Sequence, residues 1–175
     1  MDASTNPSWP DTIYSNFKRV DIRQVGYVPD AGHSRLIELC RSDPDIRDVV
    51  LTTEEEGIGL VGGATLGGQR AALLMQSSGV GNCVNMFSLL QCCRFPCVIL
   101  VTMRGDFGEF NPWQVPMGSI TEPSLKLARF LTYRVEADDD VDDIVSAACD
   151  MAFDGNLAIA VLLSQRLIGR KQWSR

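Results

Sequence analysis

The pattern of apolar and polar positions along the chain predicts an alternation of strands and helices. Three runs are almost continuously apolar, as is typical of strands buried on both faces; they are Ala71–Met75, Cys97–Met103 and Leu157–Leu163. Three further strands are predicted, at Arg23–Val28, Asp48–Leu51 and Tyr133–Val135.

Between these strands, apolar residues recur at helical spacing. The predicted helices are Thr12–Val20, Ser34–Arg41, Thr53–Gly68, Val84–Cys93, Glu122–Leu131 and Asp139–Ala152. Buried strands separated by helices predict an α/β fold, a three-layer sandwich with a mostly parallel central sheet. We expect residues 1–175 to form one domain that ends in a basic tail at residues 166–175.

Ligands of parallel sheets bind beyond the carboxyl ends of the strands. Four segments follow predicted strand ends, namely Pro29–His33, Thr52–Glu56, Gln76–Asn82 and Arg104–Gly118. The third is predicted to be a tight, glycine-bearing loop whose backbone N–H groups face a ligand. A phosphate site is a weaker interpretation, because neither GxxxxGK[ST] nor GxGxxG occurs there. The fourth is predicted to be a long irregular loop.

Composition narrows the classes of function. The net charge is −6 and no Lys/Arg cluster occurs, which argues against nucleic-acid binding. The apolar runs are too short to span a bilayer, and residues 1–10 have no apolar leader, so we expect a cytoplasmic protein without membrane contact. Six cysteines without paired CxxC motifs predict buried, reduced thiols and argue against zinc.

The acidic cluster Glu54-Glu55-Glu56 allows two interpretations. Acids in the first turn of an exposed helix are favoured by the helix dipole, and they need no further role. Here, however, the predicted helix that follows consists almost entirely of small and apolar residues. An acid at its start would lie beside a buried wall, partly desolvated, where it can share a proton with a ligand.

Three segments in order carry a resemblance to a known family. Residues 53–90 read TEEEGIGLVGGATLGGQRAALLMQSSGVGNCVNMFSLL, residues 95–105 read FPCVILVTMRG, and residues 114–118 read QVPMG. Together they resemble the pyrimidine-binding domain of thiamine-diphosphate (ThDP) dependent 2-oxoacid decarboxylases, in particular the sulfopyruvate and phosphonopyruvate decarboxylases. The likeness covers residues 25–118 well and the remainder by general layout.

The resemblance implies a catalytic role for Glu54. The family glutamate lies nine residues before a glycine of the small-residue helix, and counting back from Gly63 gives Glu54. Glu55 and Glu56 are the alternatives if the alignment is shifted. In the family, this carboxylate hydrogen-bonds N1′ of the aminopyrimidine ring and stabilises its imino tautomer.

The resemblance also implies cofactor-binding residues at two strand ends. The QSSGVGN segment matches a family loop near the pyrimidine ring, with Ser77 in place of asparagine. The predicted contacts are Gln76, Ser78, Gly79, Gly81 and Asn82, together with Pro29 and Asp30 from the VPD element.

Arg104 and Gln114 are predicted to contact the substrate, since a guanidinium suits a carboxylate, sulfonate or phosphonate. The alternative for Arg104 is a surface ion pair with Asp106 or Glu109. His33, the one histidine, is a candidate for proton transfer, and the alternative is a structural side chain. Trp113 and Gln114 in the same segment as Arg104 could face substrate or partner, and the alternative for both is a loop anchor.

The diphosphate half of such enzymes carries a GDG motif, which is absent here. The segment Asp154-Gly155-Asn156 is predicted to be a turn. The resemblance therefore implies a second, beta chain that holds Mg²⁺ and the diphosphate, with no metal ligand on this chain, in an α2β2 assembly that shares ThDP. The predicted function is the alpha subunit of a decarboxylase for a small anionic 2-oxoacid. The alternatives are a ThDP-dependent carboligase subunit and a non-catalytic partner domain of the same fold.

Overall fold

The computed structural model describes residues 8–170, which form one six-stranded sheet with only parallel neighbours. The strands are β1 (Ile22–Tyr27), β2 (Arg47–Val50), β3 (Arg70–Gln76), β4 (Cys97–Thr102), β5 (Leu131–Val135) and β6 (Ala158–Leu163). Their order across the sheet is β2-β1-β3-β4-β6-β5. Every residue of β4 and β6 is buried, as their continuous apolar runs predict.

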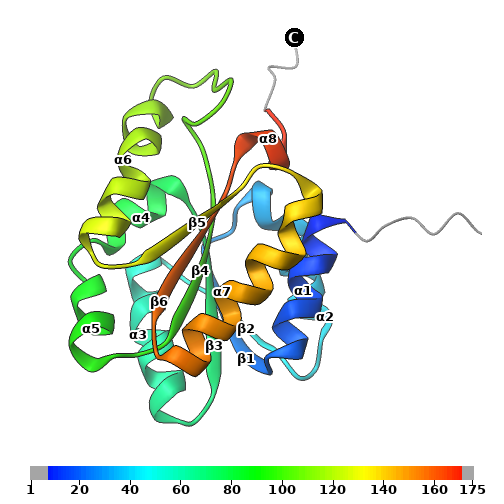
Figure 1. The fold of residues 1–175 in the computed structure, drawn as a ribbon, viewed down its shortest axis with the longest axis vertical. Coiled ribbons are helices and arrows are strands. Elements are labelled where there is room, and N and C mark those ends of the chain that lie inside the picture. The colour runs from blue at the N-terminus through cyan, green and yellow to red at the C-terminus, as the bar shows by residue number, and fades with distance from the viewer. Residues whose placement is uncertain (1–7, 171–175) are drawn as a thin grey trace, which may run out of the picture.

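Helices cover both faces of this sheet, giving the three layers seen in Figure 1. One face carries α1 (Trp9–Arg19), α2 (Ser34–Ser42) and α7 (Val141–Gly155). The other carries α3 (Glu54–Leu66), α4 (Ser77–Cys83), α5 (Phe87–Cys93) and α6 (Gln114–Leu127). An apolar core fills each interface between a helical layer and the sheet. The predicted α/β fold is thus confirmed.

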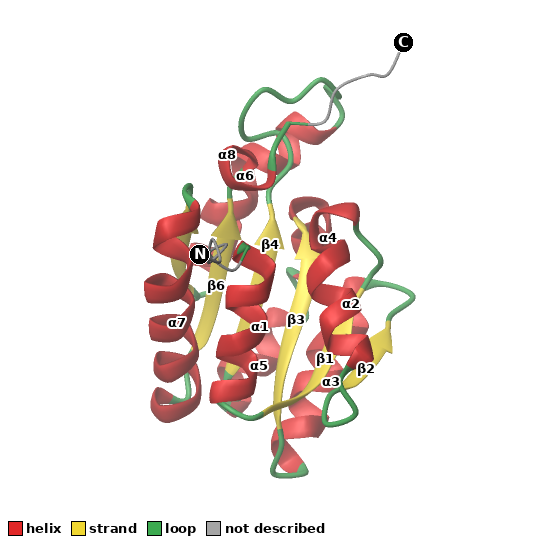
Figure 2. Ribbon diagram, turned by 90° about the vertical axis from the view of Figure 1, so that its right-hand side faces the viewer, coloured by secondary structure: helices red, strands yellow, loops and turns green. Residues whose placement is uncertain are grey.

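The strand order reverses at β1, and this reversal positions the site. From β1 the chain passes through α2 to β2 at one edge, whereas β3 lies on the other side of β1. The segments that leave β1 and β3 therefore turn to opposite faces, which opens a crevice at the carboxyl ends of the strands. The short helix α8 (Gln165–Ile168) follows β6 at the same end of the sheet (Figure 2).

The predicted loop Gln76–Asn82 is wrong, because Ser77–Cys83 is the helix α4. Neither Gly79 nor Gly81 has a positive φ angle, so neither glycine serves a turn. Gly79 lies where a Cβ atom would collide with Glu54, at 2.6 Å from its Cγ atom. Gly79 is therefore required for close packing, not for a turn. The sequence alone does not distinguish these two reasons for a glycine.

The predicted loop Arg104–Gly118 is too long, since α6 begins at Gln114. Pro116 lies in the first turn of this helix, where its missing N–H group costs nothing. A Cβ atom on Gly118 would lie 2.1 Å from the carbonyl oxygen of Arg104, so this glycine again serves close packing. The helix ends at Leu127, earlier than predicted.

The remaining differences are small. Helix α5 begins at Phe87 instead of Val84. Asn156 ends α7 in the left-handed conformation, as the predicted turn requires. Cys92 and Cys93 are exposed on α5, so the prediction of buried thiols is wrong for these two. Within residues 8–170, no helix has the length and apolar character to cross a membrane. Residues 171–175 of the predicted basic tail lie outside the described residues.

Candidate functional site

Glu54 is the first residue of α3, and its side chain is turned into the protein. The residue is 9% exposed, and its Oε2 atom accepts a hydrogen bond of 2.8 Å from Asn82 Nδ2. Asn82 is its one hydrogen-bond partner among the described residues. The two neighbouring acids are exposed, and Glu56 accepts a hydrogen bond from the backbone N–H of Thr52. Of the three acids, only Glu54 lies in a sheltered position beside the helix α4.

The backbone of α4 makes this shelter. A Cβ atom on Gly79 would lie 2.6 Å from Cγ, Cδ and Oε1 of Glu54, so any side chain there would displace the carboxylate. Gly81 and Ser78 are exposed on the same helix, and Gly81 faces the sulfur of Met117. Of the predicted cofactor residues of the QSSGVGN segment, Ser78, Gly79 and Gly81 therefore share α4 with Asn82, the partner of Glu54, whereas Gln76 is the last residue of β3.

A second polar group lies at the ends of β1, β3 and β4. Asp30 accepts hydrogen bonds from Gln76 Nε2 at 3.1 Å and from Thr102 Oγ1 at 2.5 Å. Gln76 in turn accepts a hydrogen bond of 3.1 Å from Ser78 Oγ. The structure thus connects three predicted cofactor residues, while Pro29 is exposed just before them. Sequence reasoning missed Thr102, which an apolar strand pattern does not distinguish.

Arg104 and Glu109 form a buried ion pair. Nε and Nη2 of Arg104 donate to the two carboxylate oxygens at 2.6 and 2.7 Å, and the side chains are only 9% and 3% exposed. Glu109 also accepts from the backbone N–H groups of Gly105 and Asn111 and from Gln165 Nε2. These donors, the guanidinium first, lower the pKa of Glu109 to about 2. Glu109 is one of the two acids expected as an ion-pair partner of Arg104, but the ion pair is buried, whereas a surface pair was expected.

His33 is fully buried beneath the strand ends, and no surface of its ring is open to a ligand. Its Nε2 atom lies 3.2 Å from the carbonyl oxygen of Leu100, and Nδ1 has no partner among the described residues. Burial lowers the pKa of the imidazole. The structural interpretation fits this position, and a part in proton transfer stays a prediction.

The buried His33 should make the protein lose stability as the solution becomes acidic. Because its pKa is lowered in the folded state, the ring stays neutral there, whereas the unfolded chain takes up a proton near the ordinary value of 6.5. The neutral ring makes its full contribution to the free energy of unfolding above pH 6.5. As the pH falls below 6.5, the free energy of unfolding decreases by up to ~1.4 kcal/mol per pH unit. Urea unfolding between about pH 7.5 and about pH 5.5 should show a larger loss for the wild type than for His33→Gln. Equal losses would contradict this role of the ring.

The two remaining predicted residues lie at the start of α6. Trp113 is 85% exposed, and the Oε1 atom of Gln114 is buried without a hydrogen-bond partner in the described part of the chain. The backbone of Gln114 packs against Gly105. A contact of either side chain with substrate stays a prediction.

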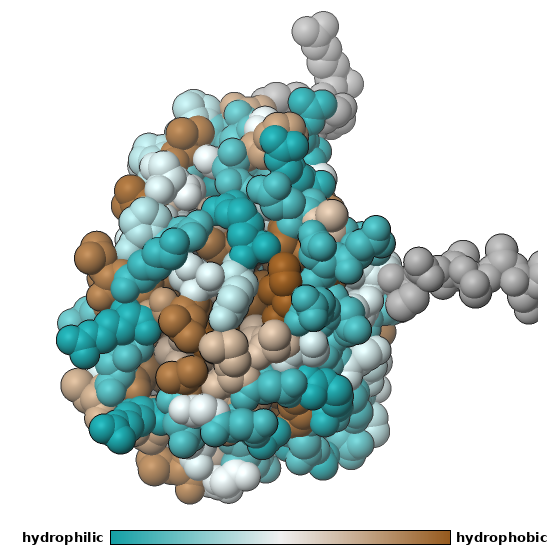
Figure 3. All heavy atoms as spheres, in the orientation of Figure 1, coloured by the Kyte–Doolittle hydropathy of each residue, from teal (hydrophilic) through white to brown (hydrophobic). Residues whose placement is uncertain are grey.

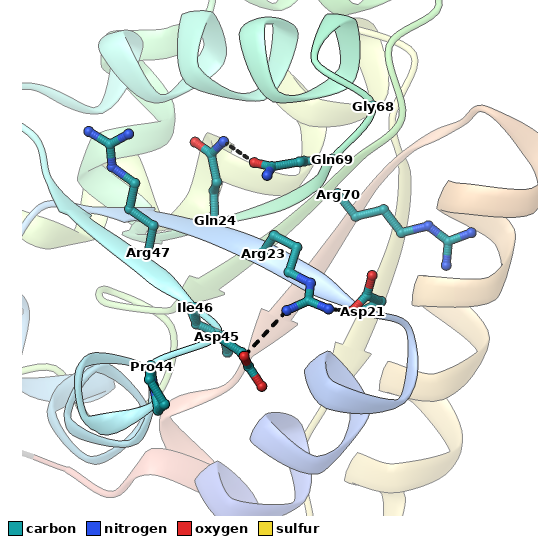
Figure 4. Close-up of a pocket in the computed structure, with 10 residues that line it drawn as sticks. All are labelled: Asp21, Arg23, Gln24, Pro44, Asp45, Ile46, Arg47, Gly68, Gln69 and Arg70. Carbon is teal, nitrogen blue, oxygen red and sulfur yellow. Dashed lines mark hydrogen bonds and ion pairs between the residues drawn. The ribbon is translucent and has the colours of Figure 1, made fainter.

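A hollow of about 850 Å³ lies at the amino ends of β1, β2 and β3 (Figure 4). This end of the sheet is opposite to the end that carries Glu54 and Asp30. Arg23 in this hollow pairs with Asp21 and Asp45, so its charge is already compensated. Gln24 and Gln69 likewise bind each other. The hollow is distant from the crevice where parallel sheets bind ligands, and it holds none of the predicted site residues.

Comparison with known proteins decides the family. The alpha subunit of sulfopyruvate decarboxylase from Methanococcus maripaludis is 32% identical over 154 residues, which cover 87% of this chain and 92% of the relative. The same subunit from Methanothermobacter thermautotrophicus is 35% identical over 156 residues, covering 87% and 93%. The chain belongs to the sulfopyruvate decarboxylase alpha-subunit family.

Two further comparisons concern family models and solved structures. No family model matches the chain. A solved structure of 2-oxoglutarate:ferredoxin oxidoreductase from Magnetococcus marinus is similar, with a TM-score of 0.70 at 12% identity. The match covers 93% of this chain and 29% of that one, and it shows the shared fold alone. The sequence resemblance to the decarboxylases is thus confirmed by the relatives.

Proposed function

We propose that this chain is the alpha subunit of a two-chain, ThDP-dependent 2-oxoacid decarboxylase, in which Glu54 activates the aminopyrimidine ring of the cofactor. The observation that carries the proposal is the sheltered carboxylate at the start of α3, whose one hydrogen-bond partner within residues 8–170 is Asn82. Relatives named as decarboxylase alpha subunits, similar over almost their whole length, support the reaction class.

The residues at this position fit the proposed cofactor. One oxygen of Glu54 accepts from Asn82, and no described residue donates to the other, so a carboxylate oxygen remains for a ring nitrogen. Gly79 keeps the space beside that oxygen free of side chain. When bound, ThDP supplies the electron sink for loss of CO2 from a 2-oxoacid. Glu54 holds or shares a proton at the ring nitrogen, which needs a group that titrates.

The outer side of α3 supports a partner chain next to Glu54. Gly59 and Gly63 are exposed, one helical turn apart, and a Cβ atom on either would meet nothing within 4 Å. Each glycine weakens a helix by about 1 kcal/mol relative to alanine, and packing within this chain does not require it. Close approach of the backbone of a partner chain to α3 would explain why glycine occupies these two positions. The exposed apolar residues Ile120 and Leu127 of α6 add to the surface left uncovered. On the face drawn in Figure 3, several apolar side chains lie at the surface on the side where α6 is found.

We expect Gly63→Leu to separate folding from assembly. The isolated chain should become more stable, by up to about 1 kcal/mol, because leucine favours the helix and meets no neighbour. Association with the beta chain should weaken at least about tenfold, or 1.4 kcal/mol. Ala147→Leu, at an exposed position of α7 on the opposite layer, is the control and should leave association unchanged. Thermal unfolding and analytical ultracentrifugation measure the two effects, and unchanged association of Gly63→Leu would contradict the docking face.

The partner proposed for this face is a beta chain that carries the GDG motif and binds Mg²⁺ and the diphosphate, in an α2β2 assembly. The substrate proposed is a small anionic 2-oxoacid such as sulfopyruvate or phosphonopyruvate, in line with the names of the relatives. Carboligation by the same assembly is the second candidate, because it uses the same activated cofactor.

The test is reconstitution of the two-chain enzyme. The chain is co-expressed with a GDG-bearing chain encoded in an adjacent reading frame, and CO2 release is measured from a panel of 2-oxoacids with and without ThDP. We expect ThDP-dependent release by the pair and none by either chain alone. A pair that binds ThDP but releases no CO2 from any substrate would instead support the non-catalytic partner domain.

A further inference from the structure

A small cavity of about 160 Å³ lies at the carboxyl ends of β1 and β4, beneath α8. Its polar lining comes from Asp30, Thr102, Arg104, Gln165 and Arg170. The volume is below the roughly 300–1,000 Å³ of pockets for drug-sized ligands, so the cavity has room for only a small group. Asp30 connects it through Gln76 and Ser78 to the helix that shelters Glu54.

Residues 165–170 lie at this cavity, and their first two side chains contact the segment that follows β4. Oε1 of Gln165 accepts hydrogen bonds of 2.9 and 3.0 Å from the backbone N–H groups of Asp106 and Phe107. The guanidinium of Arg166 lies 4.2 Å from the centre of the Phe107 ring. The segment that follows β6 is therefore joined to the segment that follows β4, and together they hold Arg170 at the mouth of the cavity.

Gly108 makes room for the side chain of Arg170. It has a φ angle of +60°, and a Cβ atom there would lie 2.4 Å from Cδ of Arg170. The aliphatic part of Arg170 thus occupies the space that any side chain at position 108 would fill. This packing gives the arginine a defined direction next to the cavity.

The charges of the cavity differ in how they are compensated. Arg104 is paired with Glu109, and the two oxygens of Asp30 accept from Gln76 and Thr102. No carboxylate of residues 8–170 forms an ion pair with Arg170. Of the two cations in this lining, Arg170 is thus the one without an ion pair among the described residues. It is exposed, and Asp30, which likewise has no ion pair there, is the acid of the same lining.

We propose that Arg170 binds the distal anionic group of the substrate, a sulfonate or phosphonate oxyanion, in this cavity. The inference rests on the proposed function, whose substrate it makes more specific. A guanidinium donates two parallel hydrogen bonds to an oxyanion, a geometry that lysine cannot reproduce. The hydrogen bonds that link Asp30, Gln76 and Ser78 connect this cavity to α4, the helix beside Glu54.

Kinetics of the reconstituted enzyme test the inference. Arg170→Ala should raise KM for sulfopyruvate at least about tenfold, which is 1.4 kcal/mol of lost binding, with kcat within about threefold. KM for pyruvate, which lacks the distal anion, should stay within about twofold. Arg170→Lys should recover only part of the loss. Arg47→Ala removes the same charge from the opposite end of the sheet and should change neither constant. An equal rise in KM for both substrates would overturn the proposal.

Binding without turnover separates this proposal from the proposed function. Sulfoacetate carries the sulfonate but no 2-oxo group, and its binding to the assembled complex is measured by calorimetry. We expect Arg170→Ala to weaken binding at least about tenfold. Equal affinity of the wild type and the variant would refute the anion site. Sulfoacetate binding that depends on Arg170, in a complex that decarboxylates no 2-oxoacid, would refute the proposed function and leave the anion site standing.

Discussion

Glu54→Gln should reduce ThDP-dependent decarboxylation by the two-chain enzyme at least about 100-fold. A carboxylate can hold or share a proton with a ring nitrogen, whereas an amide cannot titrate. The substitution should leave the fold intact, because a glutamine oxygen can accept the same hydrogen bond from Asn82. We therefore expect the loss in kcat, with ThDP affinity within about tenfold of the wild type.

The control for this experiment is Glu55→Gln. Glu55 is the adjacent residue of the same helix turn, but it is exposed, and its side chain forms no hydrogen bond or ion pair with a described residue. Both variants are compared in samples with the same fraction of assembled two-chain enzyme. Steady-state rates then report the chemical step, and ThDP titrations report the affinity for the cofactor. Normal turnover by Glu54→Gln, or an equal loss in Glu55→Gln, would remove Glu54 from the proposed mechanism.

The sequence predicted those parts of the fold that depend on local pattern. The apolar runs became the inner strands β3, β4 and β6, because strands covered on both faces need apolar residues at every position. The small and apolar residues after the acidic cluster predicted a sheltered acid at the start of the helix, the family resemblance singled out Glu54, and Glu54 is the buried one of the three. Both results follow from residues close together in the chain.

The helix α4 shows where local pattern is ambiguous. Glycine permits a turn by its backbone freedom, and it permits close packing by its missing side chain. At Gly79 the second reason applies, but the side chain that requires it is Glu54, from another segment. Sequence alone does not show that these two residues meet.

The network around Glu109 lies beyond local pattern altogether. Gln165 reaches it from a position 56 residues later in the chain, and no periodicity connects the two. The only local signal was the acid five residues after Arg104. Likewise, His33 is buried against β4, where its ring meets the carbonyl of Leu100 from a distant part of the chain, and a lone histidine in the sequence does not reveal this contact.

Glu109→Ala should cause a large loss of stability in the isolated chain. Removal of one partner leaves the Arg104 guanidinium buried without its counter-ion, which typically costs about 3–5 kcal/mol. The pKa of Glu109, lowered from 4.5 to about 2, corresponds to a similar figure of about 3 kcal/mol. For a chain of this size the midpoint of thermal unfolding should fall by roughly 6–20 °C.

Two further variants show that the effect comes from the unpaired charge. Glu122→Ala removes a half-exposed glutamate that pairs with Lys126 and Arg134, and it should cost no more than about 1 kcal/mol. Arg104→Met combined with Glu109→Leu removes both charges and should recover much of the loss, because apolar side chains of similar size can replace a buried pair. The contribution should also disappear as the pH falls from 4.5 toward 2, where the folded carboxylate takes up its proton. If Glu109→Ala and Glu122→Ala lowered the unfolding midpoint equally, the ion pair would not be what holds the segment after β4 against α8.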